Sequence, residues 1–233
     1  CAALVAGACV LAWPQVRFWM TPEQTYATRP GQILRVTLAD GSRLVLNGRS
    51  RLSVRLAPDR REVRLEAGEA LFDVYHDAAR PFSVASAEGT VNVLGTRFDL
   101  ARNAGSLDLV VERGLVRFAG NQPGVNAVDV AAAHRASLVD GRIAPPERIA
   151  LQDYEGDWRE GWLQVSDMPL GALVARLQRW SAKPIEVDDP ALLRVRVAGR
   201  LRLDDPAQLL ENLGVLHGFA VRTTSRAYVL DRP

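Results

Sequence analysis

Four phrases decide the fold of this chain: VTLADGSRLVLN (Val36–Asn47), EVRLEAGEALFDV (Glu62–Val74), RPFSVAS (Arg80–Ser86) and VNVLGTRFDL (Val91–Leu100). Apolar and polar residues alternate in them, which is the pattern of a strand with one buried face. Short strands in close succession, without helices between them, predict an all-β sandwich, jelly roll or solenoid. No repeat of about 20 to 50 residues is evident, so the sequence alone does not support a regular solenoid.

The register of the first hairpin follows from its apolar residues. A two-residue Asp-Gly loop would place apolar residues opposite polar ones. A three-residue loop, Ala39–Gly41, pairs Val36 with Leu44 instead and puts Gly41 where a left-handed residue is needed. We therefore expect the three-residue loop.

The alternating pattern continues to Phe118. Its apolar residues are Leu52, Val54 and Leu56; Val63 and Leu65; Ala70, Phe72 and Val74; Val91 and Val93; Phe98 and Leu100; Leu107, Leu109 and Val111; and Val116 with Phe118. Five glycines are predicted to mark the turns, namely Gly68, Gly89, Gly95, Gly105 and Gly114.

Composition narrows the possible functions. The 233 residues suit two compact units. The net charge is only +2, and the arginines are interleaved with apolar and acidic residues, so we expect no nucleic-acid binding. Both cysteines, Cys1 and Cys9, lie in the first apolar segment, which excludes a disulfide framework or thiolate metal site in the folded part.

The N-terminal segment CAALVAGACVLAW (Cys1–Trp13) carries no charge. A membrane span needs about twenty apolar residues, so we interpret it as the second half of a transmembrane helix that begins upstream. Alternatives are a signal-peptide remnant or a lipoprotein cleavage site at Ala6–Cys9. The residues expected in the membrane are Leu4, Val5, Val10, Leu11 and Trp13.

From Trp162 onward the pattern becomes that of a small α+β module with the order βαββαββ. Asp167–Pro169 predicts the start of a helix; its apolar face comprises Leu170, Leu173, Val174, Leu177 and Trp180. Asp204–Pro206 predicts a second helix that ends at His217-Gly218; its inward residues are Leu209, Leu210, Leu213 and Leu216. The expected organisation is a partial transmembrane segment (1–20), a β domain (21–140), a linker (141–161) and the module (162–233).

The order and spacing of the four opening phrases resemble the FecR-like proteins, which are membrane-anchored regulators of iron-responsive sigma factors. WREGWLQVSDMPLGALVARLQRW and VAGRLRLDDPAQLLENLGVLHGFAV resemble the secretin and TonB short N-terminal domain, with which FecR-like chains often end. The resemblance implies a twisted, solenoid-like or jelly-roll-like β domain. It also implies a single-pass inner-membrane protein with residues from about 21 onward in the periplasm. The cytoplasmic sigma-binding domain of the family would lie outside this chain.

The same resemblance implies several partners. The N-terminal signalling domain of an outer-membrane TonB-dependent transducer would contact the periplasmic region during iron–siderophore signalling. An extracytoplasmic-function sigma factor would bind the missing cytoplasmic domain, and intramembrane or periplasmic proteases would release that domain. Trp180 and Leu201 are candidate contact residues for the transducer, although both also fit the apolar periodicity of a core.

The sequence carries no constellation typical of an enzyme. His76, His134 and His217 lie in different elements and lack metal-ligand spacing. A nucleophile elbow, a phosphate loop and a dinucleotide fingerprint are absent as well. We therefore expect no cofactor, no metal and no turnover activity; a cupin-like metalloenzyme would need a histidine cluster. A structural periplasmic assembly subunit related to secretin N-domains is the alternative function, and ring formation would favour it.

One self-reaction is conceivable at Gly95-Thr96. The Thr96 hydroxyl could attack the carbonyl carbon of Gly95 and form an ester that water cleaves, provided that the peptide is strained and a proton acceptor lies nearby. Some FecR-like proteins are thought to self-cleave at such a step. The simpler interpretation is a structural bulge in which only glycine fits.

Overall fold

The computed structural model describes residues 17–103, 105–151 and 157–232. The chain divides into two compact units, each described here by itself. The first comprises the N-terminal part to Ala27 with Arg35–Leu44 and Arg51–Arg148, and the second comprises Thr28–Leu34, Val45–Ser50 and the chain from Ile149. Within the described residues, no helix is both long and apolar enough to cross a membrane. The membrane segment predicted for residues 1–20 falls mostly on residues 1–16, which lie outside the described ranges.

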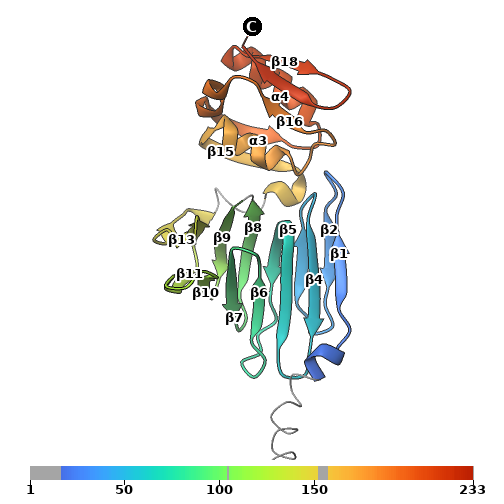
Figure 1. The fold of residues 1–233 in the computed structure, drawn as a ribbon, viewed down its shortest axis with the longest axis vertical. Coiled ribbons are helices and arrows are strands. Elements are labelled where there is room, and N and C mark those ends of the chain that lie inside the picture. The colour runs from blue at the N-terminus through green and yellow to red at the C-terminus, as the bar shows by residue number, and fades with distance from the viewer. Residues whose placement is uncertain (1–16, 104, 152–156, 233) are drawn as a thin grey trace, which may run out of the picture. The chain divides into compact units, whose positions relative to one another are not determined.

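The first unit is built from strands, as Figure 1 shows. They are β1 (Gln24–Ala27), β2 (Leu34–Thr37), β3 (Arg43–Leu46), β4 (Arg51–Leu56), β5 (Arg61–Asp73), β6 (Phe82–Ala85), β7 (Gly89–Val93), β8 (Arg97–Asn103), β9 (Ser106–Arg113), β10 (Leu115–Gly120), β11 (Val128–Ala131), β12 (His134–Val139), β13 (Arg142–Ile143) and β14 (Glu147–Arg148). The prediction of a mainly β unit is confirmed. Residues 142–148, assigned above to a linker, form β13 and β14, which pair with β12.

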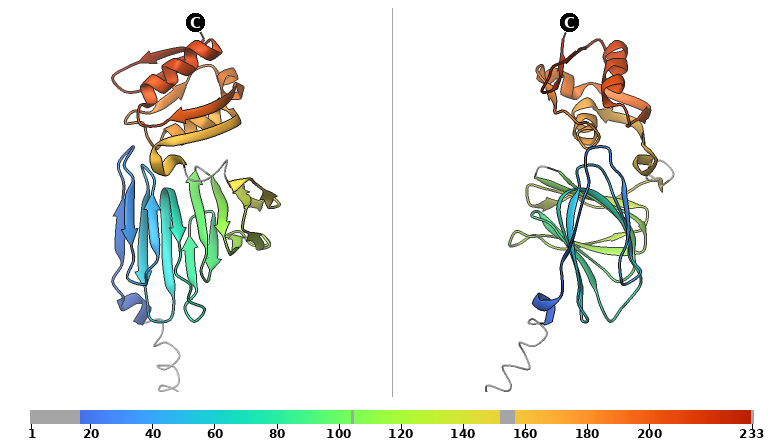
Figure 2. Two further views of the ribbon diagram at one scale, coloured as in Figure 1. Left: turned by 180° about the vertical axis from the view of Figure 1, so that it is seen from behind. Right: turned by 90° about the vertical axis from the view of Figure 1, so that its right-hand side faces the viewer.

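The long strand β5 connects the two layers of this unit. Its first half, Arg61–Ala67, pairs with β4 and, in parallel, with β6. Its second half, Gly68–Asp73, pairs with β8, whose other neighbour is β9. All these strands thus belong to one nearly closed sheet, and Figure 2 shows its two layers facing each other.

Gly68 lies inside β5, so the prediction that it marks a turn is wrong. Its φ of +85° is a left-handed backbone conformation that residues other than glycine rarely adopt. The strand changes partners at this residue, from β4 to β8. Glycine therefore bends a continuous strand here rather than ending it.

Alternating side chains fill the space between the layers. Phe72 and Phe98 stack with their ring centroids 5.0 Å apart, and Phe82 meets Phe72 edge to face at 6.4 Å. All three are fully buried. Aromatic residues bury more apolar area than other side chains, so this cluster is a major source of stability for the unit.

The hairpin between β2 and β3 has the predicted loop. The Leu38 amide donates to the Ser42 carbonyl at 2.8 Å, which leaves Ala39–Gly41 as the three loop residues. Gly41 has a φ of +87°. The register prediction is confirmed, because it placed the apolar residues on one face.

The described residues from 157 to 232 of the second unit include the α-helices α3 and α4 and two small sheets. Its elements are η1 (Asp157–Glu160), β15 (Trp162–Pro169), α3 (Leu170–Leu177), β16 (Ile185–Val187), η2 (Pro190–Arg194), β17 (Arg196–Arg202), α4 (Pro206–His217), β18 (Ala220–Thr223) and β19 (Tyr228–Asp231). β15 pairs with β17, and the second sheet has the order β16-β19-β18.

The two helices begin differently. Asp205 caps α4, since its carboxylate accepts a hydrogen bond from the Gln208 amide at 3.0 Å, and Gly218 ends the helix in the left-handed region. Asp167 does not cap α3: it lies within β15 and pairs with Arg196. The helix start predicted at Asp167–Pro169 is found, since α3 begins directly after Pro169, although β15 continues as far as that residue.

Candidate functional site

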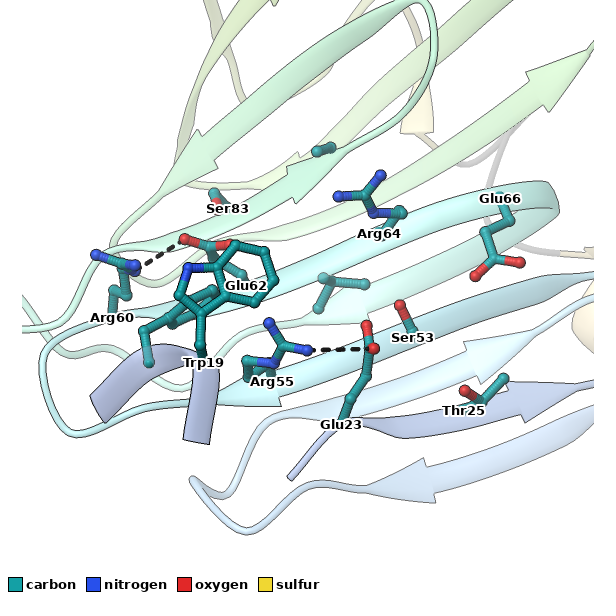
Figure 3. A pocket seen from close by; sticks show the side chains of 13 residues that line it. Trp19, Glu23, Thr25, Ser53, Arg55, Arg60, Glu62, Arg64, Glu66 and Ser83 are labelled. Atoms are coloured by element: carbon teal, nitrogen blue, oxygen red, sulfur yellow. Dashed lines mark hydrogen bonds and ion pairs between the residues drawn. The ribbon is translucent and has the colours of Figure 1, made fainter. Parts of the chain in front are cut away.

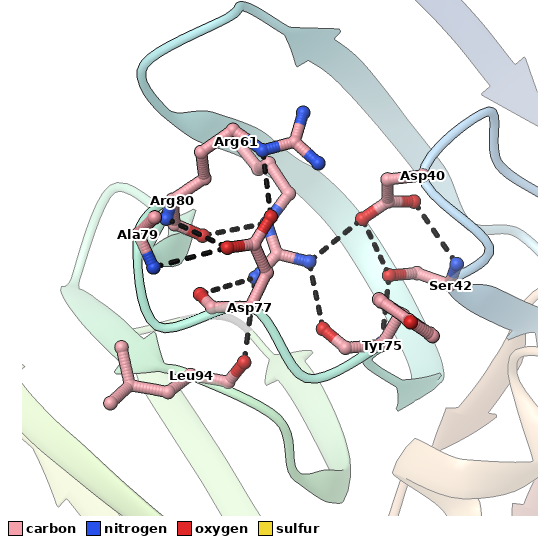
Figure 4. A network of polar contacts seen from close by, with 8 residues as sticks. All are labelled: Asp40, Ser42, Arg61, Tyr75, Asp77, Ala79, Arg80 and Leu94. Atoms are coloured by element: carbon pink, nitrogen blue, oxygen red, sulfur yellow. Dashed lines mark hydrogen bonds and ion pairs between the residues drawn. The ribbon is translucent and has the colours of Figure 1, made fainter.

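A buried ion pair lies at one end of the first unit, where the β2–β3 loop meets the start of β5. The Arg61 guanidinium donates to the Asp40 carboxylate at 2.9 Å, and the two side chains are 0% and 1% exposed. Ser42, also buried, donates its hydroxyl to the same carboxylate at 2.7 Å. Figure 4 shows the group. A buried charge must be paired and hydrogen-bonded to be tolerated, and Asp40 meets both conditions here.

Arg61 also donates to backbone carbonyls of two loops. Its guanidinium lies 2.8 Å from the carbonyl oxygens of Tyr75 and Arg80, and 3.4 Å from that of Leu94. Tyr75 is tied to the hairpin as well, since its amide donates to the Ser42 hydroxyl at 3.0 Å. One arginine therefore joins the β2–β3 loop, the loop after β5 and the loop between β7 and β8.

Asp77 organises the loop after β5. Its carboxylate accepts hydrogen bonds from the Ala79 and Arg80 amides and from the Arg80 guanidinium at 2.7 Å. The hydrogen bond from the Arg80 side chain is the main reason that the pKa of Asp77 lies below its usual value. These contacts explain the conformation of the loop without a bound ligand.

Gly95 and Thr96, the predicted self-cleavage step, lie beside this network. A Cβ on Gly95 would lie only 2.5–2.6 Å from the Cβ, Cα and Nδ1 of His76, so nothing larger than glycine fits. The Val74 amide donates to the Thr96 carbonyl at 3.0 Å and the Asp77 amide to that of Leu94 at 2.9 Å. The close approach of two backbone segments thus accounts for the glycine.

The Thr96 side chain is buried and already hydrogen-bonded. Its hydroxyl donates to the Leu115 carbonyl at 3.1 Å, and the residue is 2% exposed. A carbonyl oxygen is too weak a base to deprotonate a hydroxyl. The imidazole of His76 lies against Gly95 and is the nearest titratable group that the close contacts identify. Cleavage at this step is untested and stays a hypothesis.

A polar groove of about 530 Å³ runs over the outer face of β1, β4, β5 and β6 (Figure 3). Its charged side chains compensate one another: Arg55 pairs with Glu23 at 3.3 Å and Arg60 with Glu62 at 2.9 Å. Such balanced charges give no net field for an anion or a cation. We therefore do not assign a small-molecule site to this groove.

The groove instead holds the beginning of the described chain. Residues 17–20 are helical, and Phe18 is buried beneath the Arg60 guanidinium, which lies 3.9 Å from the ring centroid. Arg55 lies over the same ring at 4.9 Å. These cation–π contacts fasten the segment to the sheet.

The predicted contact residues of the second unit lie in different surroundings. Leu201, on β17 opposite Leu163, is 8% exposed and belongs to the core. Trp180 follows the end of α3 and is half-buried. A buried side chain cannot readily contact a partner. Leu201 therefore fits the alternative role of a core residue better than Trp180 does.

The exposed apolar residues of the second unit are elsewhere. Val215 and Leu216, near the C-terminus of α4, are 87% and 75% exposed. The prediction that Leu216 faces inward is wrong. Phe219 takes the inner place instead, packing against Gly214 with its ring buried. Helical spacing favoured Leu216, and the helix end predicted at His217-Gly218 did not by itself show that the turn there brings Phe219 inward.

The sheet next to α4 has an open edge at β18. In the described residues, β18 pairs with β19 alone. An edge strand presents backbone groups with which a strand of another protein can pair. Metal binding has no comparable basis, since no cluster of three His, Cys, Asp or Glu side chains suited to a metal ion occurs among the described residues.

Comparison with known proteins identifies the domain formed by the first strands of the chain. Residues 24–117 match the family model of the FecR protein. The chain carries a FecR domain. The match runs from the start of β1 into β10, and these strands surround the Arg61 network. The resemblance given by the four phrases is confirmed.

Solved structures are similar over more of the chain. Two structures of a "putative anti-sigma factor" from Parabacteroides distasonis ATCC 8503 have TM-scores of 0.77 and 0.78, each with 21% sequence identity. They match 91% and 90% of this chain and 100% and 99% of their own. At this identity the similarity concerns the fold. No curated protein matches the chain.

Proposed function

We propose that this FecR-domain chain is the sensor part of a transmembrane sigma-factor regulator. Its partner would be the signalling domain of an outer-membrane TonB-dependent transducer, and its output would be an extracytoplasmic-function sigma factor in iron–siderophore signalling. The observation that carries the proposal is the FecR match over residues 24–117. The fold shared with the Parabacteroides structures supports it.

The two units would have different tasks in this relay. The FecR domain has loops tied by the buried Arg61–Asp40 pair and charges balanced in its groove, which suits a rigid scaffold. The second unit offers an open strand edge and the exposed pair Val215 and Leu216. A partner shifts an equilibrium only if it binds one state better than the other. We place that differential contact on α4 and β18.

The family resemblance supplies the remaining parts of the proposal. A single span formed by the apolar N-terminal segment would place the described residues in the periplasm. Regulated proteolysis in or near the membrane would then release the sigma-binding part. The chain itself would perform no turnover chemistry.

The direct test is binding of the full chain, held in detergent, to purified transducer signalling domains from the same genome, each assayed singly. We expect at least one to bind, and Leu216→Asp to weaken it by about tenfold or more, as for loss of a central apolar contact. Val139→Asp is the matched control, because Val139 is exposed on the other unit. Absence of binding to every domain, or ring assembly in size measurements, would contradict the relay.

A further inference from the structure

Exposed apolar side chains gather at one end of the FecR domain. Of the nine large hydrophobic side chains exposed among the described residues, five belong to this end, with exposures from 45% to 77%. They are Trp19, Met20, Tyr75, Leu94 and Leu115, which we call the loop-end patch. Isolated exposed apolar residues are ordinary on a protein surface, whereas a concentration of them marks an interaction site.

Hydrogen bonds bring three members of the patch together. Arg61 bonds to the carbonyls of both Tyr75 and Leu94. The Thr96 hydroxyl, two residues beyond Leu94, bonds to the Leu115 carbonyl. Tyr75 and Leu94 therefore protrude from loops that Arg61 holds, and Leu115, the first residue of β10, is held through Thr96.

Trp19 and Met20 join the patch through the turn between β4 and β5. Phe18 is held under Arg60, the residue before Arg61, and Trp19 packs edge to face on Phe18 at 5.7 Å. Figure 1 shows residues 17–20 at the same end of the unit as the start of β5. The patch thus combines Trp19 and Met20 on a short helical segment, Tyr75 and Leu94 on two loops, and Leu115 at the start of β10.

The uncharged N-terminal sequence precedes the loop-end patch closely along the chain. Cys1–Trp13 contains no charged residue, and the described structure begins at Arg17, beside the patch. Arg17 and Arg43 are exposed here, and neither forms an ion pair with a described residue. Tryptophan and tyrosine collect at the membrane–water boundary, and arginines there bind anionic headgroups.

We propose that the loop-end patch rests on the surface of a phospholipid bilayer. Tyr75, Leu94 and Leu115 would enter the headgroup region, while Arg17 and Arg43 contact anionic phosphates. This contact would orient the FecR domain on the membrane instead of leaving it on a free tether. The proposal is independent of which transducer or sigma factor the chain serves.

A fluorescent label at Leu115 tests this contact in the full chain. In a Cys1→Ser, Cys9→Ser background, Leu115→Cys carries an environment-sensitive nitrobenzoxadiazole group, and the protein is reconstituted in vesicles of phosphatidylethanolamine and phosphatidylglycerol. Val139→Cys is the matched control. It is similarly exposed but lies at the opposite end of the unit, since Val139 pairs with Ser106 whereas Leu115 follows the far end of β9.

We expect a blue-shifted emission at position 115 and quenching by doxyl-labelled lipid at least about threefold stronger than at position 139. Tyr75→Ser with Leu94→Ser should reduce the quenching at 115 to the control level while flotation with the vesicles persists. Arg17→Glu with Arg43→Glu should remove any preference for phosphatidylglycerol. Circular dichroism verifies that each variant is folded.

Three results would overturn the proposal. Equal quenching at positions 115 and 139 would mean that the patch does not face the lipid. A blue shift at 115 without lipid quenching would indicate contact with another protein molecule. Failure of the full chain to float with the vesicles would remove the bilayer as a partner altogether.

Discussion

The two units place the same kind of ion pair in opposite surroundings. In the FecR domain, Arg61 and Asp40 are removed from water and hold loops together. In the second unit, Arg196 and Asp167 pair across β15 and β17 with side chains 53% and 67% exposed. Exposed pairs contribute little to stability, whereas breaking a buried pair leaves an uncompensated charge. This difference agrees with the proposed roles, in which the FecR domain is the rigid scaffold and the second unit is the more adaptable binding module.

Removing the buried carboxylate should have the largest effect. Asp40→Ala is expected to lower the free energy of unfolding by about 3–5 kcal/mol, because the Arg61 charge stays buried without a counterion. Asp167→Ala should leave the urea midpoint unchanged, since its pair is solvated. Both can be measured by circular dichroism during urea unfolding of the full chain in detergent.

A double variant keeps this prediction testable if Asp40→Ala fails to fold. Asp40→Leu with Arg61→Met removes both charges and should recover part of the stability. Recovery stays incomplete because the Tyr75 and Arg80 carbonyls lose their donor. Equal losses for Asp40→Ala and Asp167→Ala would abolish the distinction between the two units.

Replacing a glycine with alanine should lower the free energy of unfolding in the FecR domain and raise it in the second unit. Gly95→Ala is expected to cost about 1–3 kcal/mol, because its Cβ would overlap the His76 backbone. Gly171→Ala, inside α3, meets the exposed Leu193 side chain at 3.2 Å, which can move, and gains up to about 1 kcal/mol in helix propensity. Thermal unfolding of both variants measures this. His76→Gly should not rescue Gly95→Ala, since the His76 Cα remains in the way.

Surface carboxylates should give smaller, pH-dependent effects. The hydrogen bond from Arg102 holds the pKa of Glu88 below its ordinary value of 4.5. A depressed pKa means that the stabilisation is present above pH 4.5 and is lost as pH falls through the folded-state pKa. Arg102→Gln should raise the pKa of Glu88 toward 4.5, and NMR titration of the carboxyl carbon measures it. In the second unit, Arg202→Gln should likewise raise the pKa of Asp204, which Arg202 lowers. An unchanged Glu88 titration would show that this ion pair does not form in solution.

Self-cleavage between Gly95 and Thr96 is expected to be undetectable. Since the Thr96 hydroxyl donates to a carbonyl, we expect the purified chain to give a single intact mass. Two fragments that divide between Gly95 and Thr96, with masses that sum to the chain plus one water, would refute this expectation. Their loss in Thr96→Ala would then identify the hydroxyl as the nucleophile.

The sequence predicted the β fold because alternation and turn chemistry are local signals. The three-residue hairpin loop follows from matching apolar residues across a turn. Gly68 was misjudged because a glycine that bends a strand looks the same in sequence as a glycine that ends one. Only the pairing of β5 with both β4 and β8 distinguishes the two.

The candidate sites were less predictable because they depend on contacts distant in sequence. Arg61 and Asp40 are 21 residues apart, and nothing local marks either as buried. The loop-end patch combines residues from four segments that are adjacent only after folding. The exposure of Leu216 was not predicted because helical spacing describes a face but does not say where the helix stops covering the core.

Hydrogen exchange of the full chain, with and without a bound transducer signalling domain, tests the central claim most directly. If the second unit receives the partner while the FecR domain acts as a scaffold, binding slows exchange in α4 and β18 and leaves β4 and β5 unchanged. Protection confined to the FecR domain, with none in α4 or β18, would contradict the account.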